Sequence, residues 1–255
     1  MLSNGMTYGQ SASAWNVAYF AVPVMPVIDE QNTNAWPVRY ASAQTLGYRD
    51  GKNPFPYMDY SNNQIRTRKI LTNFYAKFNF FEDKLTFQTT YNVGGAFQNE
   101  RYVGLPYYVS NALQRNLSSI TKTSYNTFNQ IWDNVLNYRE SFGSHNVEGM
   151  LGMSYRDEAW ESLSGSGNEL QSIDREDTWF LSQTPTESRT VTDNGNRIYG
   201  LSYFGRAAYN YHEKYFMYAT LRRDGTMQYQ EKWGTFPAFG AGWVLSEETF
   251  MNDLP

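Results

Sequence analysis

The chain has 255 residues and a formal net charge of −4, and this acidic balance argues against a nucleic-acid backbone as partner, since such partners require a basic surface. It contains no cysteine, which excludes disulfides, thiolate metal sites and cysteine nucleophiles. Aromatic residues make up 17% of the chain, yet mean hydropathy is −0.62. The apolar residues are therefore dispersed and form no run long enough for a transmembrane helix.

The N-terminal quarter of the chain shows little periodicity. Residues 1–63 are rich in proline and aromatic residues and are predicted to form an irregular, loop-rich segment. No Lys or Arg occurs before Arg39, and the apolar stretch ahead of it is interrupted by Pro23 and Pro26, which does not fit a signal peptide. We therefore expect the chain to be an internal fragment of a longer exported protein.

The remaining residues, 64–255, are predicted to form successive β-strands. Apolar and polar side chains alternate with a period of two over seven segments, which is typical of a sheet with one apolar face. The predicted strands cover residues 64–80, 83–98, 119–142, 144–163, 196–212, 214–229 and 234–246. The sequence therefore indicates an all-β, antiparallel fold.

Connections between the predicted strands alternate between short and long. Tight turns are expected at residues 81–84, 143–145 and 212–214. Residues 99–118 and 164–195 are instead long excursions rich in Gly, Ser, Asn and Thr. Short turns on one side and long loops on the other are the pattern of a membrane β-barrel.

The predicted strand faces differ clearly in polarity. Facing lipid we expect Leu85, Phe87, Tyr199, Leu201, Ala219 and Leu221. Facing a lumen we expect Gln88, Arg206 and Arg222. Aromatic residues lie near the strand ends and smaller apolar residues nearer the middle, as expected where the ends meet lipid head groups.

Several short motifs follow one another in order toward the C-terminus. They are Tyr203-Phe204-Gly205-Arg206, Ala219-Thr220-Leu221-Arg222-Arg223-Asp224-Gly225, Trp233-Gly234-Thr235-Phe236-Pro237, Gly242-Trp243 and Ser246-Glu247-Glu248 with Phe250. In this order they resemble the barrel of the SusC/RagA group of TonB-linked (TonB-dependent) outer-membrane transporters. Earlier segments agree more loosely, so that the resemblance spans most of the chain. Thr226-Met227-Gln228-Tyr229 departs from the group, which more often has small polar residues and a Phe there.

This resemblance implies part of an antiparallel transmembrane β-barrel in the outer membrane. Plugged barrels of this kind have about 22 strands, so the seven to eight strands here would form an open sheet, with residues 1–63 extracellular or covering the lumen and residues 64–255 forming the wall. The implied function is import of oligosaccharides or peptides, energised through the TonB complex by parts of the protein absent here. The implied partners are a surface SusD-like lipoprotein and outer-membrane lipid; no cofactor is implied.

Two other functions stay open on the residues alone. One is a non-transporting structural barrel or adhesin. The other is a soluble β-sandwich that binds carbohydrate or cleaves glycosides, which the aromatic and Asn content would suit.

Aromatic residues outside the confident strands are candidate ligand or partner contacts, because flat rings stack on sugars and pack against proteins. They are Trp15, Trp36, Tyr107, Tyr108, Trp179 and Phe180. The alternative is that these rings pack within the loops themselves, since long ordered loops need a core of their own.

Charged residues on the lumen side form a second candidate site. On a strand, Arg222 and Asp224 share one face and Arg223 takes the other, so Arg206, Arg222 and Asp224 could form a lumen charge network that contacts ligand. The alternative is that the same charges fix a strand to its neighbours or to the plug.

The sequence shows no catalytic or metal constellation. His145 and His212 are expected in tight turns without a second ligand nearby. Asp157 and Glu158 with Glu161 could suggest paired glycosidase carboxylates, but such clusters are more often charged strand ends. The sequence therefore predicts no enzyme, no catalytic residue and no metal site.

Overall fold

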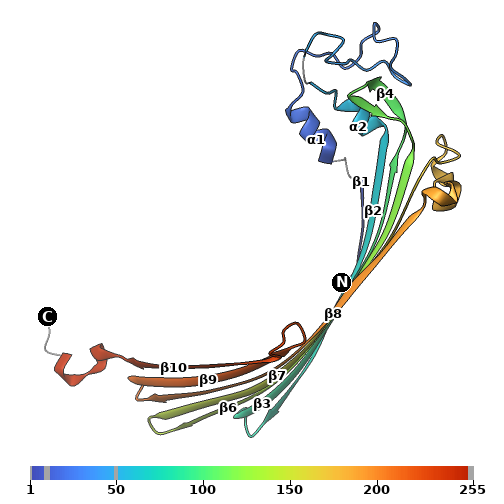
Figure 1. Ribbon diagram of the computed structural model, residues 1–255. Coiled ribbons are helices and arrows are strands. Elements are labelled where there is room, and N and C mark those ends of the chain that lie inside the picture. The colour runs from blue at the N-terminus through green and yellow to red at the C-terminus, as the bar shows by residue number, and fades with distance from the viewer. Residues whose placement is uncertain (1, 9–11, 49–50, 252–255) are drawn as a thin grey trace.

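The computed structural model describes residues 2–8, 12–48 and 51–251. Its main feature is a single-layered antiparallel sheet of eight strands in the order β1-β2-β3-β6-β7-β8-β9-β10 (Figure 1). The strands are β1 (Leu2–Tyr8), β2 (Ser61–Phe80), β3 (Leu85–Gly104), β6 (Ser119–Phe142), β7 (His145–Asn168), β8 (Thr190–Tyr211), β9 (Tyr215–Thr226) and β10 (Trp233–Trp243). The period-two alternation of the sequence thus produces one large sheet.

Smaller elements lie in the connections. Strands β4 (Tyr107–Ser110) and β5 (Leu113–Arg115) form a separate two-stranded sheet, and the helices are α1 (Ala12–Tyr19) and α2 (Phe55–Asp59). Short 3-10 turns cover Glu176–Thr178, Leu181–Gln183, Thr186–Ser188, Leu245–Glu247 and Thr249–Met251. Among the helices that the structure describes, none has the length and apolarity needed to cross a bilayer.

All seven predicted strands are present, and four of them are longer than expected. Strand β2 begins at Ser61 and β8 at Thr190, ahead of the predicted starts at residues 64 and 196. Strand β3 continues to Gly104 and β7 to Asn168, beyond the predicted ends at residues 98 and 163. Strand β1 was not predicted, because its sequence LSNGMTY has no clear alternation; it pairs residue by residue with positions 64–70 of β2. Residues 1–63, expected to be irregular, therefore include one strand of the sheet and two helices.

The two ends of the sheet differ in the length of their connections. The tight turns after β2, β6 and β8 lie at one end, and the long connections gather at the other (Figure 1). Phe81, Glu82 and Asp83 all adopt positive φ, as does Gly143, which starts the two-residue turn between β6 and β7. These left-handed residues reverse the chain within two to four positions, and the predicted alternation of short and long connections is confirmed.

Buried side chains are concentrated in the loops and at the strand tips beneath them. One cluster contains Tyr40, Tyr107, Val109 and Leu113; the other contains Val103, Ile120, Leu170 and Trp179. The long strands themselves have no second sheet packed against them within the described residues. A soluble β-sandwich needs two packed sheets, so the single layer contradicts that alternative.

The sheet has two open edges. Strands β1 and β10 each pair on one side only, and no described pair closes the sheet into a cylinder. A curved, single-layered antiparallel sheet with open edges is the wall of a β-barrel over part of its circumference. The predicted fold class, a partial β-barrel with an open sheet, is confirmed.

Candidate functional site

In the half of the sheet near the tight turns, one face is largely apolar across all the long strands. The pairing register places in a single row Phe78, Phe87, Leu136, Leu151, Gly205, Leu221 and Pro237. Large side chains on this apolar face are exposed, including Leu151 at 65% and Phe239 at 83%. A contiguous apolar surface of this kind is not stable in water and needs a partner of similar polarity.

An aromatic row borders the apolar face at the tight-turn end. Phe142 stacks on His145, whose ring lies 4.8 Å from that of Tyr211. Tyr211 stacks in turn on Tyr215, and Tyr215 on Trp243, with centroid distances of 6.3 and 6.4 Å. Such rows mark the level where a barrel meets lipid head groups.

The two histidines lie near this aromatic row. His212 occupies a tight turn as predicted, but His145 begins β7, and its Nδ1 lies 2.6 Å from the hydroxyl of Tyr209. Within the described residues, no group of three or more His, Cys, Asp or Glu side chains could hold a metal ion.

The opposite face is mixed and largely polar. One row on it contains Lys77, Gln88, Val135, Gly152, Phe204, Arg222 and Phe236. The predicted division is confirmed, because Leu85, Phe87, Tyr199, Leu201, Ala219 and Leu221 share the apolar face while Gln88, Arg206 and Arg222 share the polar face. We call the second surface the polar face.

Two arginines of the polar face stack on aromatic rings. The Arg222 guanidinium lies 5.7 Å from the Phe204 ring centre, and the Arg206 guanidinium lies 5.4 Å from that of Tyr218. Each ring covers a glycine of the next strand: a Cβ at Gly152 would overlap Phe204, and a Cβ at Gly240 would overlap Tyr218. The four ring and glycine partners were not predicted, although glycine inside a strand is a signal of such close approach.

Of the three residues predicted to form a lumen charge network, the structure brings Arg222 and Asp224 together. Arg222 Nε donates to both carboxylate oxygens of Asp224, at 2.7 and 2.8 Å. Arg206 lies on the same face, but its guanidinium lies over the Tyr218 ring, and the residue lines a groove of about 420 Å³. The charged residues lining that groove are Lys77, Asp83, Lys84, Arg139, Glu148 and Arg206. Arg223 points to the apolar face, as expected, and lies 5.0 Å from the Trp233 ring centre.

The candidate aromatics near the N-terminal segment differ in exposure. Tyr107 is 2% exposed and stacks on Tyr60, and burial raises the pKa of Tyr107 to about 12. Trp36 is 48% exposed and is joined to Tyr108 by two backbone hydrogen bonds of 2.9 Å. Trp15 falls in α1, and its side chain lies outside the described part of the structure. Among these, Trp36 and Tyr108 offer accessible rings.

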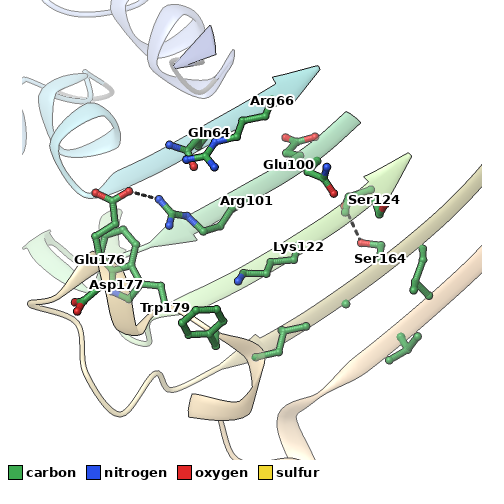
Figure 2. Close-up of a pocket in the computed structure, with 17 residues that line it drawn as sticks. Gln64, Arg66, Glu100, Arg101, Lys122, Ser124, Ser164, Glu176, Asp177 and Trp179 are labelled. Atoms are coloured by element: carbon green, nitrogen blue, oxygen red, sulfur yellow. Dashed lines mark hydrogen bonds and ion pairs between the residues drawn. The ribbon is translucent and has the colours of Figure 1, made fainter. Parts of the chain in front are cut away.

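The other two candidate aromatics lie in the connection between β7 and β8. Trp179 is 6% exposed and packs on Val103 and Ile120, so its ring belongs to the loop core. Phe180 is 52% exposed, and the centre of its ring lies 4.2 Å from Lys122 Nζ. Both residues line a cavity of about 600 Å³ between this connection and the strands (Figure 2).

The acidic cluster does not form a carboxylate pair. Asp157 and Glu158 are consecutive in β7 and point to opposite faces. Asp157 is 1% exposed and accepts hydrogen bonds from Arg197 Nε and Nη2, at 2.9 and 2.7 Å, and from Gln130. It therefore holds β6, β7 and β8 together.

These observations define the class of the protein: part of the wall of a membrane-type β-barrel with one apolar and one polar face. No protein-family model matches the chain. Among curated proteins, it is 31% identical over 130 residues to a TonB-dependent receptor of Formosa agariphila, covering 48% of this chain and 12% of that protein. It is 24% identical over 212 residues to the TonB-dependent receptor SusC of Bacteroides thetaiotaomicron, covering 80% of this chain and 20% of SusC.

Solved structures show the same fold. The RagAB peptide transporter matches with a TM-score of 0.75 and 15% identity over 99% of this chain and 28% of that chain. The RagAB peptide importer in its open-open state matches with a TM-score of 0.70 and 16% identity, over 94% and 27%. The chain spans a fifth or less of the curated relatives reported above. The resemblance to the SusC/RagA group is confirmed, in sequence by SusC and in fold by RagAB.

Proposed function

We propose that the chain forms part of the wall of an outer-membrane transporter that imports oligosaccharides or peptides and is energised through the TonB complex. The observation that carries this proposal is the pair of opposite faces, one apolar and exposed, the other lined by arginine stacks. In a bilayer, hydrocarbon would cover the apolar face and water would fill the lumen along the polar face. Relatives named TonB-dependent receptors and a peptide transporter support import.

The loop end of the sheet would then face the cell exterior. Trp36, Tyr108 and Phe180 are the accessible candidate aromatics there, and we propose that they contact ligand or a surface SusD-like lipoprotein. On the polar face, Arg206 and the Arg222–Asp224 pair would contact ligand or the plug. The wall would catalyse no reaction, because its proposed role is to enclose the path of the imported ligand.

Uptake by whole cells tests this proposal. Cells that carry the full-length protein would be given a labelled oligosaccharide or peptide mixture, with and without a functional TonB complex. We expect uptake to fall to the level of cells that lack the transporter when TonB is inactivated, while surface labelling shows unchanged amounts of the protein. Unchanged uptake without TonB, or cleavage of glycan by the purified protein, would contradict the proposal.

A further inference from the structure

The cavity under the β7–β8 connection lies on the apolar side of the wall. Its floor includes Arg66, Asn99, Arg101 and Lys122, and the register assigns all four to the face that also contains Phe87. Figure 2 shows Arg101 and Lys122 rising from adjacent strands toward the segment that contains Glu176 and Trp179. The cavity is therefore separated by the sheet from the polar face and from any ligand that passes along it.

Positive charge dominates the floor of this cavity. Arg101 forms an ion pair with Glu176, and Asp177 is paired with Arg175. Within the described residues, neither Arg66 nor Lys122 forms an ion pair; Lys122 Nζ instead lies over the Phe180 ring. Glu100 also lines the cavity, but its position in β3 assigns its side chain to the polar face, opposite to Arg101. Two cations thus stand without a carboxylate partner in an aromatic-walled cavity, which suits an anionic ligand.

Exposed apolar side chains continue from the cavity along the same face of the sheet, toward the tight-turn end. Leu163 and Val191 border the cavity and are 52% and 73% exposed. Phe97 follows two positions below Asn99 on β3, about 7 Å along the strand, and it is 45% exposed beside Phe128 at 42%. A ligand with a charged head and an apolar tail would match both parts of this surface.

We propose that this cavity binds the anionic, phosphorylated head group of an outer-membrane lipid, whose acyl chains lie along Leu163, Phe97 and Phe128. Arg66 and Lys122 contact the phosphate, and Phe180 covers it. Trp179 holds the connection in place by packing on Val103 and Ile120. This inference rests on the proposed position of the wall in the outer membrane, and it concerns a site outside the transport path.

Lipid binding to the full-length protein in detergent micelles tests the proposal. The probe is fluorescent phosphatidylglycerol, with zwitterionic phosphatidylethanolamine as the comparison lipid. We expect the double variant Arg66→Gln/Lys122→Gln to lose affinity for phosphatidylglycerol by about five-fold for each cation removed. The matched control Lys69→Gln/Arg156→Gln removes two cations from the polar face of the same sheet and should bind as the unmodified protein does.

Two further measurements are needed. One distinguishes the loss of positive charge from misfolding, and the other distinguishes a lipid ligand from free inorganic phosphate. Lys122→Arg keeps the charge and should bind nearly as tightly as the unmodified protein. Equal affinity for the two lipids, or unchanged binding by the double variant, would overturn the proposal. Full displacement of the lipid by millimolar inorganic phosphate would overturn the lipid assignment in favour of a free-phosphate site. The assay requires no TonB complex, so a failed uptake experiment leaves its result intact.

Discussion

Arginines on the polar face are held by aromatic rings that are themselves seated over glycines. Gly152 lies opposite Phe204, and the absence of a Cβ lets the ring lie flat on the neighbouring strand, where Arg222 covers it. Gly240, Tyr218 and Arg206 repeat the arrangement. A ring that shields a strand glycine stabilises strand pairing.

Replacing Gly152 tests this arrangement. We expect Gly152→Ala to lower the free energy of unfolding by about 1–3 kcal/mol, because its Cβ would overlap the Phe204 ring and displace it. The matched control is Gly149→Ala in the same strand, where a Cβ would meet nothing within 4 Å. Urea unfolding of the full-length protein in lipid vesicles measures both changes. Equal effects of the two variants would show that the ring does not depend on the glycine.

Asp157 gives a second prediction at the scale of single residues. Asp157→Asn weakens a buried double hydrogen bond from Arg197, and we expect a loss of about 1–3 kcal/mol in unfolding free energy. Asp177→Asn is the control, because Asp177 and its partner Arg175 are both more than half exposed and such pairs contribute less than about 1 kcal/mol. The same urea titration compares them; a larger effect at Asp177 would contradict this account.

At the scale of elements, the connection between β7 and β8 packs on the strand tips through the buried ring of Trp179, together with Leu170. Trp179 packs on Val103, Ile120 and Leu170, whereas Phe180 is half exposed. We expect Trp179→Ala to loosen residues 169–189, because truncating a buried Trp costs about 3–5 kcal/mol. Phe180→Ala should leave the connection ordered. Hydrogen exchange of these residues in the full-length protein distinguishes the variants, and equal exchange in both would refute the assignment of Trp179 to the loop core.

The long strands were predictable and the loops were not, for a physical reason. A side-chain period of two is local, so the seven long strands and the faces of Arg206 and Leu201 follow from sequence. Strand β1 has a weak pattern and depends on pairing with β2. Burial of Tyr107 and Trp179 depends on which strand ends come together beneath the loops. The two-residue period of the side chains does not predict this, because it is a local property of each strand.

At the scale of the whole molecule, the open edges are the main weakness of this sheet. The outer sides of β1 and β10 present backbone groups without partners among the described residues, and lipid cannot hydrogen-bond them. Expressed alone, the 255-residue chain should aggregate or form an open sheet in detergent. Size-exclusion chromatography with light scattering measures this. A monodisperse, detergent-free monomer with a cooperative melt would contradict the barrel-wall account.

In the membrane, one face of the wall should contact lipid and the other should contact water. This chain has no cysteine. Single cysteines can be placed at Ala219, Thr220, Leu221 and Arg222 of β9 and spin-labelled in the full-length protein in membranes, with any cysteine elsewhere in that protein replaced by serine. A high rate of collision between the spin label and oxygen indicates contact with lipid. A high rate of collision with a water-soluble nickel complex indicates contact with the water of the lumen. We predict that accessibility alternates along the strand: labels at positions 219 and 221 should collide mainly with oxygen, and labels at positions 220 and 222 mainly with the nickel complex. Uniform nickel access at all four positions would contradict the claim.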